Sequence, residues 1–273
     1  MPLPLLQSDR IGPGFAHGFT TRAGGVSATP YDTLNLGGKW GDEPAHVAEN
    51  RRRVAEAVGG VPFVARQVHG VAIRRVRAGE DPAEVARAEA DGLCTDVPGQ
   101  VVGVFVADCV PALLADPRTG ACAAVHAGWR GTVAGILPAA VRALASEFGS
   151  RPSDLRVALG PAIGACCFEV GLEVVEAVVA AIPEARARGI VLPSPRGRAD
   201  KAHVDLRAAN RLLLERAGVD PAAVDLVDPS GACTHHDRAR FFSFRRDGAA
   251  TGQQMGVIRA GGAPALEGAR PRL

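Results

Sequence analysis

Short apolar runs dominate the middle of the chain. Residues 101–107, 112–115 and 121–126 are apolar at nearly every position, which predicts three short strands. The turn-forming residues 117–120 separate the last two runs. Apolar residues at helical spacing follow over about 133–148, so this region predicts strands alternating with helices, as in an α/β fold.

Three further helices are predicted from helical spacing of apolar residues and from residues that favour helix ends. Pro44 suits the first turn of a helix over about 42–58, and Gly59 follows its last apolar residue. The other two helices are expected over about 171–182 and 205–217. With the middle region, these segments indicate a mixed α/β chain.

The remaining apolar segments predict strand pairs and isolated strands. The pairs are 63–69 with 72–76 around Gly70, and a hairpin of 241–245 with 254–259 across Asp247–Gly248. Isolated strands are expected at 155–159 and 224–227, and short strands with loops over 15–38. Residues 185–201 show no periodicity and are expected to form an exposed excursion.

The length allows one large domain or two small ones. The chain has 273 residues and a mass of 28.2 kDa, without a linker, an internal repeat or a low-complexity block. We therefore expect one catalytic domain over 1–273. Residues 260–273 are rich in Gly, Ala, Pro and Arg, so this end is expected to be a frayed tail.

Charge and the N-terminal residues exclude several partners. Thirty-one basic and 29 acidic residues give a formal net charge of +2, which does not suggest a nucleic-acid partner. The first residues lack the basic and apolar regions of a signal peptide, and no apolar run is long enough to cross a bilayer. We expect a cytoplasmic protein that does not contact a membrane, either a monomer or a small homo-oligomer.

Candidate chemistry lies in residues 106–132, where Cys109 and His126 each follow an apolar run. With His69 from the segment 67–70 they offer one thiolate and two imidazoles. Three such ligands leave a fourth tetrahedral position for water or substrate, as in catalytic zinc sites. Two other interpretations stay open: Cys109 is a core residue, or the zinc is structural, although no fourth ligand lies at a short finger-like spacing.

The other cysteines do not form a disulfide framework. The chain has six cysteines at uneven spacing, so reduced thiols are expected. Cys166 and Cys167 precede Phe168 and are interpreted as buried thiols, while Cys94 and Cys122 are interpreted as core residues. The segment 233–236, Cys-Thr-His-His, is a possible second metal cluster, but the sequence offers no evident partner segment for it.

Several segments, taken in order, resemble one family. They are His17-Gly-Phe-Thr-Thr-Arg-Ala-Gly-Gly-Val-Ser, Asn35-Leu-Gly, Gly41-Asp42 with Asn50-Arg51, Gln67-Val-His-Gly, Ala90-Asp-Gly, Ala107-Asp-Cys-Val-Pro, His126-Ala-Gly-Trp-Arg-Gly-Thr, Gly160-Pro-Ala-Ile-Gly, Cys166-Cys-Phe-Glu-Val-Gly and Phe241-Phe-Ser-Phe-Arg-Arg-Asp-Gly. Together they resemble the YfiH-like proteins, also described as laccase-domain, polyphenol oxidase or purine nucleoside phosphorylase proteins.

The resemblance implies a fold, a metal site and an activity. The fold is a layered α/β/β/α sandwich, distantly like the catalytic domain of cytotoxic necrotizing toxins. The metal is zinc held by His69, Cys109 and His126. The activity is phosphorolysis of purine nucleosides, namely adenosine, inosine, guanosine or methylthioadenosine, with adenosine deamination alongside. Laccase-like oxidation with Cu²⁺ is also implied, but the chain's seven histidines are few for a multicopper oxidase.

Each reaction needs further side chains. Deamination needs a carboxylate that carries protons without binding the metal, and Glu169 is preferred over Asp91 and Asp108. Phosphorolysis needs cations for the phosphate, for which Arg51 and Arg130 are the candidates, although a surface ion pair would explain Arg130 and a solvated charged helix face would explain Arg51. The resemblance also places His17 and Asn35 near the site, where each would otherwise be a hydrogen-bonding loop residue.

Two alternatives use the same residues differently. With Cys109 as a nucleophile and His126 as its base, the chain would be an amide or ester hydrolase, including one that edits peptidoglycan precursors. As a metal-stabilised interaction protein, it would have zinc fully coordinated by protein and no turnover. Protection of Cys109 from alkylation by bound metal separates the first alternative from a zinc enzyme.

Overall fold

The structure, a computed structural model, describes residues 3–228 and 233–261. The helices are α1 (Pro44–Val58), α2 (Pro82–Val85), α3 (Trp129–Val133), α4 (Ile136–Phe148), α5 (Leu172–Ala181), α6 (Leu206–Arg216) and α7 (Phe244–Asp247). The strands are β1 (Leu5–Leu6), β2 (His17–Thr20), β3 (Pro62–Phe63), β4 (Ile73–Arg75), β5 (Gly92–Thr95), β6 (Val101–Val106), β7 (Val110–Ala115), β8 (Cys122–Ala127), β9 (Arg156–Leu159), β10 (Glu169–Gly171), β11 (Val191–Pro193), β12 (Lys201–Val204), β13 (Val224–Leu226) and β14 (Gln254–Arg259).

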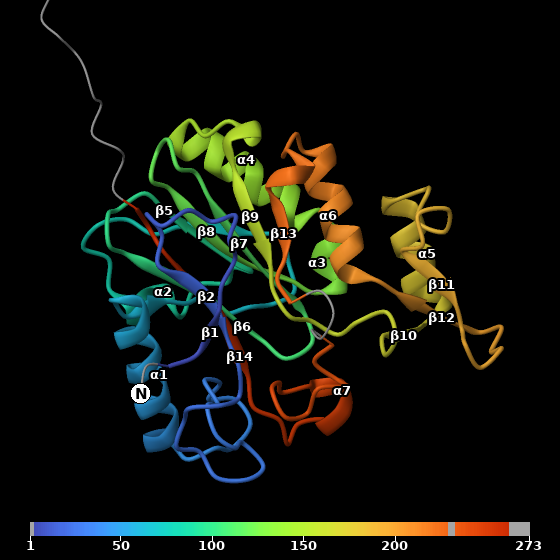
Figure 1. The fold of residues 1–273 in the computed structure, drawn as a ribbon, viewed down its shortest axis with the longest axis horizontal. Coiled ribbons are helices and arrows are strands. Elements are labelled where there is room, and N and C mark those ends of the chain that lie inside the picture. Colours follow the sequence, from blue (N-terminus) through green and yellow to red (C-terminus); the bar gives the residue numbers. More distant parts are fainter. Residues whose placement is uncertain (1–2, 229–232, 262–273) are drawn as a thin grey trace, which may run out of the picture.

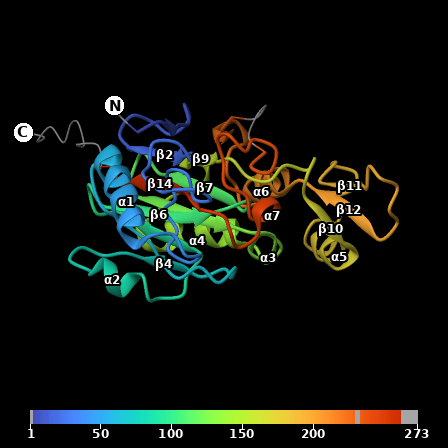
Figure 2. The same ribbon diagram turned by 90° about the horizontal axis from the view of Figure 1, so that it is seen from below.

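These strands form three sheets (Figure 1). The first sheet has the order β1-β2-β14-β6-β3, and the second has the order β13-β9-β7-β8-β5-β4. A smaller sheet, β10-β12-β11, lies to one side with α5 (Figures 1 and 2). Its residues Val170 and Val204 pack in the same apolar cluster as Leu137 of α4, so the main core continues into this part of the molecule.

Alternating side chains bury the first two sheets on both faces. Val102 and Val104 of β6 pack with Leu113 of β7 and Ala124 of β8, which places this apolar cluster between the two sheets. The neighbouring residues of β6 and β7 point the opposite way, as the period of two in a strand requires. The continuous apolar runs in the sequence therefore reflect strands covered on both faces.

Helices cover the two outer faces. Val54 of α1 packs with Val101 and Val257 outside the first sheet, and Leu137 of α4 packs with Val125 outside the second. The layers follow the order α1, first sheet, second sheet, and then α4 with α3 and α6 (Figure 1). This is a mixed α/β fold with the expected order of layers, while the likeness to necrotizing toxins stays a prediction.

The predicted helices are confirmed, with one correction. The apolar run at 133–148 is the longer half of a pair, α3 and α4, separated at Gly135. Gly135 has a φ of 83° and lies between the two helices, which explains the break because residues other than glycine rarely adopt this conformation.

Both predicted strand pairs are wrong. β3 pairs with β6 in the first sheet, whereas β4 pairs with β5 in the second. Residues 244–247 form α7 instead of a hairpin strand, and Gly248 donates its N–H to the carbonyl of Phe244. A glycine after an aspartate suits the end of a helix as well as a two-residue turn, so local chemistry could not separate these structures.

Three other expectations can be compared with the structure. The excursion 185–201 contains β11 and the first residue of β12, so it is partly ordered as a sheet. Ala260 and Gly261 donate N–H groups to the carbonyls of Gln100 and Gly120, so the frayed tail does not begin at residue 260. The rest of the expected tail, 262–273, lies outside the described residues.

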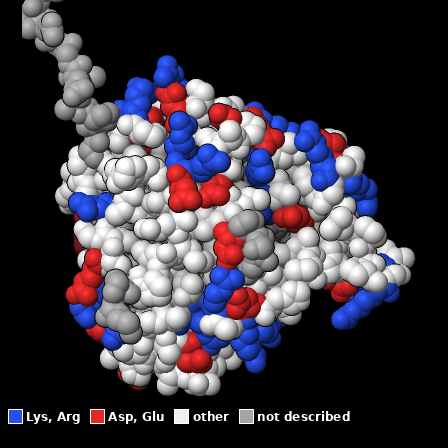
Figure 3. All heavy atoms as spheres, viewed as in Figure 1, with Lys and Arg blue, Asp and Glu red and all other residues white. Residues whose placement is uncertain are grey.

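Charged side chains of both signs are interspersed over the face shown in Figure 3. Among residues 3–228 and 233–261, none of the helices combines the length and the apolar character needed to span a bilayer.

Candidate metal centre

Cys109 lies where the chain passes from the first sheet to the second. β6 belongs to the first sheet and β7 to the second, so residues 107–109 cross from one to the other. Asp108 has a φ of 91°, and its carboxylate accepts hydrogen bonds from the Thr234 hydroxyl at 2.6 Å and the Arg245 N–H at 2.6 Å. These bonds hold an uncommon backbone conformation and fix the position of the next residue, Cys109.

Cys109, His126 and His69 converge. The donor atoms of all three residues lie within 4.8 Å of one another, and Cys109 Sγ is 4.0 Å from His69 Nε2. His126 lies near the end of β8 directly opposite Pro111 of β7, which brings it beside the crossing. His69 comes from the loop before β4 and has a φ of 61°. The imidazole rings meet edge to face with centroids 4.8 Å apart.

Asp91 orients both histidines. Its buried carboxylate lies 2.8 Å from His126 Nδ1 and accepts the backbone N–H groups of Val68, His69 and Gly70 at 3.1, 2.9 and 2.7 Å. A proton on Nδ1 leaves Nε2 of His126 to bind a cation, as in carboxylate–histidine–metal arrangements. The pKa of Asp91 is lowered: burial opposes the shift, but His126 and the backbone N–H groups outweigh it.

The thiol and the imidazole favour their charged forms together. Burial alone would raise the pKa of Cys109, but the charge and hydrogen bonding of His126 and His69 lower it to about 6. Burial would also lower the pKa of His126, but the Cys109 thiolate and the Asp91 carboxylate raise it to about 9. A thiolate is the form of cysteine that binds metals and attacks electrophiles.

A cavity of about 790 Å³ opens over these three residues. Trp40 and Phe244 form a tilted aromatic pair on its wall, with ring centroids 5.6 Å apart. Lys39, Arg66 and Arg245 add positive charge to the lining. This volume lies within the usual range for small-molecule sites.

Sequence reasoning did not single out these wall residues. Trp40 and Lys39 follow the Asn35-Leu-Gly motif, and Phe244 and Arg245 lie inside the Phe241–Gly248 motif. The motifs mark the segments but do not show which side chains face a common cavity, because that depends on how distant segments pack.

The predicted arginines lie away from the three donors. Arg130 is exposed within the five-residue helix α3, and its guanidinium stacks on Trp129 with 4.4 Å to the ring centroid. Arg51 donates from Nε to the carbonyl of Leu36 and lies over the Phe105 ring. Phe105 itself lines the cavity, whereas neither Arg51 nor Arg130 is among its lining residues. Their roles in phosphate binding stay predictions.

His17 and Asn35 are both buried; Asn35 lies in a loop as expected, but His17 is the first residue of β2, so its placement in a loop is wrong. His17 Nδ1 lies 2.8 Å from the carbonyl of Phe15, and its Nε2 accepts the N–H of Ser8 at 3.1 Å. The amide of Asn35 donates to Asp42 at 2.8 Å and accepts the N–H of Gln253, a cavity residue, at 2.9 Å. Asn35 thus acts on the site through its neighbours, and substrate contact by either residue stays a prediction.

Glu169, the preferred proton carrier, is on β10. Its carboxylate lies 3.3 Å from the Ser194 hydroxyl, 3.5 Å from an Arg198 nitrogen and 3.9 Å from His203 Nε2. The side chain is not among the groups that line the cavity, although Phe168 beside it is. These contacts favour a structural part for Glu169, and its catalytic role stays a prediction.

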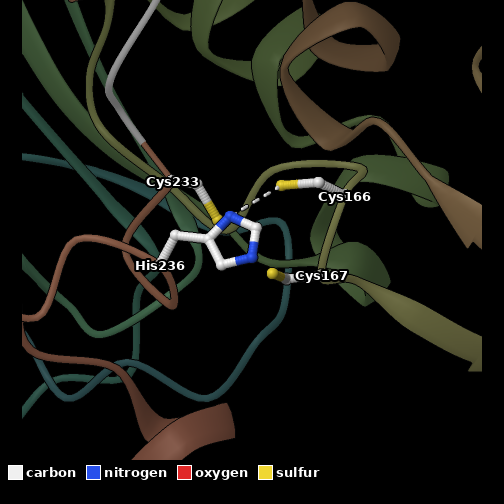
Figure 4. A group of neighbouring side chains, drawn as sticks. All are labelled: Cys166, Cys167, Cys233 and His236. Atoms are coloured by element: carbon white, nitrogen blue, oxygen red, sulfur yellow. Dashed lines mark hydrogen bonds between the residues drawn. The ribbon is translucent and has the colours of Figure 1, made fainter.

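A second group of donors also forms. Cys166, Cys167, Cys233 and His236 place their donor atoms within 4.8 Å of one another, so these four residues could hold a metal (Figure 4). The expectation that the segment 233–236 has no partner segment is therefore wrong. The partner is the Cys166–Cys167 pair, which the sequence alone had assigned to buried thiols; Cys166 is exposed.

Comparison with known proteins identifies the family. The model of a family described as multi-copper polyphenol oxidoreductase laccase matches residues 16–261. A purine nucleoside phosphorylase of Deinococcus radiodurans is 41% identical over 97% of this chain and 95% of its own length. A purine nucleoside phosphorylase of Pseudomonas aeruginosa is 43% identical over 83% of this chain and 86% of its own length.

Solved structures agree with this match. The crystal structure of the Bacillus licheniformis hypothetical protein YfiH has a TM-score of 0.85 and 33% identity, covering 95% of this chain and 97% of that one. YlmD from Geobacillus stearothermophilus has a TM-score of 0.82 and 34% identity, covering 95% and 99%. The chain therefore belongs to the multi-copper polyphenol oxidoreductase laccase family, the family of YfiH.

Proposed function

We propose that the chain is a zinc-dependent purine nucleoside phosphorylase. It would convert adenosine, inosine, guanosine or methylthioadenosine and phosphate to base and ribose 1-phosphate, with adenosine deamination as a second activity. The observation that carries the proposal is one cavity that joins the three donor side chains to an aromatic pair and three cationic side chains. Relatives of about this length and about 40% identity are named purine nucleoside phosphorylases.

The donor set fits zinc. One thiolate and two imidazoles are usual zinc ligands, and three protein ligands leave a position for substrate. Gly128 leaves room for them, because a Cβ there would lie 2.9 Å from His69 Cδ2 and 3.1 Å from Cys109 Sγ. When bound, zinc would supply Lewis-acid polarisation of an oxygen of the phosphate, the ribose or water.

The wall residues suit the two substrates. The rings of Trp40 and Phe244 offer apolar faces on which a purine can stack. Lys39, Arg66 and Arg245 can attract phosphate into a partly enclosed site, where charge acts more strongly than in bulk water. Positioning and electrostatics supply most of what such a displacement needs from a protein.

Arg245 is held in place for this role. Its Nη1 donates to the carbonyl of Glu169 at 2.8 Å, and its guanidinium lies over the Phe168 ring with 5.2 Å to the centroid. These contacts restrict the side chain before substrate arrives, which reduces the entropy lost on binding.

Deamination is the weaker part of the proposal. It needs a carboxylate free to carry a proton near the metal. Asp91 is occupied by His126 and three backbone N–H groups, and Asp108 by Thr234 and Arg245. We therefore rank phosphorolysis first.

Copper-dependent phenol oxidation is the second candidate, because two histidines and one cysteine are also a copper donor set. Multicopper chemistry needs several histidine-rich centres. Of the seven histidines in the chain, His69 and His126 reach this site. The others lie elsewhere: His17 and His203 bond to backbone carbonyls, His46 is on α1, and His235 and His236 are in the loop before α7.

The decisive experiment is Cys109→Ala with metal analysis and an inosine assay in phosphate buffer. We expect loss of the zinc at this site and a fall in base release of more than about 100-fold, since even changes outside the ligand shell cost about 10–100-fold. Cys94→Ala, at a buried cysteine of β5 outside both donor groups, is the control and should keep both properties.

Retention of zinc and activity in Cys109→Ala would refute the proposal. Iodoacetamide separates it from the hydrolase alternative: Cys109 should be protected in zinc-loaded protein and react after chelation. Alkylation at Cys109 with metal present, together with ester or amide turnover, would favour the hydrolase.

A further inference from the structure

We infer that Cys166, Cys167, Cys233 and His236 form a second, closed binding site for a thiophilic divalent cation of the zinc class, and that this ion stabilises one wall of the cavity. Four protein donors fill a tetrahedral shell, which is the pattern of a structural zinc site rather than a catalytic one. The role of the ion at the cavity wall rests on the proposed function. The existence of the ion site does not depend on it.

The donor spacing is close to what tetrahedral zinc requires. Bond lengths of about 2.3 Å to sulfur and about 2.0 Å to nitrogen require neighbouring donors to be about 3.5–3.8 Å apart. Cys166 Sγ lies 3.5 Å from His236 Nδ1, and all four donors fall within 4.8 Å of one another. Figure 4 shows the three sulfurs near the imidazole nitrogens of His236, and small side-chain adjustments would bring the four donors to one ion.

The backbone brings the two donor pairs together. Thr234 donates its N–H to the carbonyl of Ala162 in a parallel bridge, and Gly164 directs its N–H to Cys233 Sγ at 3.4 Å. A turn from Gly164, closed by the N–H groups of Cys167 and Phe168, presents the adjacent cysteines. Backbone N–H groups directed at cysteine sulfur are typical support for metal-bound thiolates.

A glycine leaves space for the donors. A Cβ on Gly164 would lie 3.2 Å from Cys166 Sγ and 3.4 Å from Cys233 Cβ. Cys166 and His236 are exposed, so an ion can enter from solvent. The cluster is separate from the first site, with which it shares no donor.

The cluster adjoins the cavity through its backbone. Phe168 follows the cysteine pair directly and lines the cavity together with Arg245. Arg245 also directs Nη1 at the carbonyl of Cys167, at 3.5 Å. On the other side, Arg246 donates to the carbonyls of Thr234 and His235, at 2.8 and 3.0 Å. An ion that joins the Cys166–Cys167 turn to the segment 233–236 would therefore restrict the motion of Phe168, which follows the first, and of Arg245, which follows the second.

The test counts metal ions in the full chain, purified in reductant and loaded with zinc, by native mass spectrometry. Wild-type protein should bind two ions, and Cys166→Ala, His236→Ala and Cys109→Ala should each bind one. The double variant Cys109→Ala/Cys166→Ala should bind none, and the control Cys94→Ala should bind two. Circular dichroism confirms that each variant is folded.

Cobalt loading identifies which site is filled. Cys109→Ala should keep an intense thiolate-to-cobalt absorption from three sulfurs, whereas Cys166→Ala should lose most of it. One ion in the wild type that disappears with Cys109→Ala and is unaffected by Cys166→Ala would overturn the inference. A protein mass lower by two hydrogens in reductant, lost in Cys166→Ala, would also overturn it by showing a disulfide.

Steady-state kinetics test whether the second ion stabilises the cavity wall. Cys166→Ala should raise KM for inosine about 5–10-fold and change kcat by less than about 2-fold, because it disturbs binding and leaves the first site intact. An unchanged KM in a variant that has lost the second ion would overturn this role. If the wild type shows no phosphorolysis, the proposed function fails, while the ion count still decides the second site.

Discussion

Asp91 shows how one carboxylate can assemble a site. It accepts hydrogen bonds from three consecutive N–H groups in the loop of His69 and from the ring of His126. Charge-assisted bonds of this kind are about twice as strong as neutral ones. They give His69 its left-handed backbone conformation and give His126 its tautomer, so both rings face Cys109.

Gly128 is predicted to be needed for tight zinc binding, for steric reasons alone. Its φ of −71° is ordinary, so alanine would suit the backbone, but the added methyl would press on His69 and Cys109. We expect Gly128→Ala to weaken zinc binding by at least about 10-fold in competition with a chelator, similar to the cost of disturbing a ligand's surroundings. Gly14→Ala, with open space around its Cβ, is the matched control; equal affinities in the two variants would contradict the prediction.

The charge state of Cys109 predicts a pH dependence in metal-free protein. With its pKa lowered from 9.0 to about 6, the thiolate persists at neutral pH and is lost as the pH falls through about 6. His126, with its pKa raised from 6.5 to about 9, loses its proton as the pH rises through about 9. The ion pair therefore contributes stability between about pH 6 and pH 9 and declines on either side.

Alkylation mapped by mass spectrometry checks this prediction. The rate at Cys109 should reach half of its plateau near pH 6, because only the thiolate reacts. Cys94 provides the internal reference, since burial raises the pKa of its thiol to about 12. A midpoint near pH 9 at Cys109 would contradict the ion pair.

At the level of elements, the crossing between the two sheets places the sulfur of Cys109 beside His69 and His126. Strands β6 and β7 are adjacent in sequence but belong to different sheets, so the residues between them turn sharply. Asp108 ties this turn to Thr234 and to the second residue of α7. Through these hydrogen bonds, Asp108 links the crossing to the loop before α7 and to the cavity wall.

Asp108→Asn should loosen that junction. The amide offers one neutral accepting oxygen in place of two charged ones, so the hydrogen bond to Arg245 or to Thr234 is weakened or reversed, and we expect a loss of about 1–3 kcal/mol in the free energy of unfolding. KM for inosine should rise because Arg245 lines the cavity. Denaturant unfolding and steady-state kinetics measure both. Thr234→Val, which removes one hydroxyl, should cost less; a larger loss there would contradict this account.

At the level of the whole molecule, the core does not depend on either donor group. Its three apolar clusters lie between the sheets and under the helices, and they are built from buried aliphatic and aromatic side chains. Burial on this scale supports a domain of this length without metal. Zinc should therefore act as a ligand of a folded protein.

Chelation is expected to lower Tm without unfolding the chain at room temperature. Losing each ion, present at about 100 times its Kd, removes about 2.7 kcal/mol, which corresponds to roughly 5–10 °C per ion for a chain of this size. Far-UV circular dichroism should stay unchanged at 25 °C, and added zinc should restore Tm. Cooperative loss of the signal on chelation would instead support the metal-stabilised interaction protein.

Local pattern was sufficient where one element determined the outcome. Helical spacing predicted α1, α5 and α6 because each helix turns one apolar face toward a sheet and carries its own end signals. The runs at β6, β7 and β8 predicted strands for a similar reason. Pairing was not predictable: β14 bonds to β2 and β6, far away in sequence, and alternation along a strand does not name its partner.

The sequence by itself determined the types of most elements and the family motifs, since residue type and short-range spacing encode these, and it offered His69, Cys109 and His126 as candidate donors. The tertiary structure decided which side chains share a space. It brought Cys166 to His236 across 70 residues, placed Arg245 instead of Arg130 at the cavity, and engaged Asp91 and Asp108 in hydrogen bonds. Such contacts depend on the order of strands and on crossings between sheets, which balance many weak interactions over the whole chain.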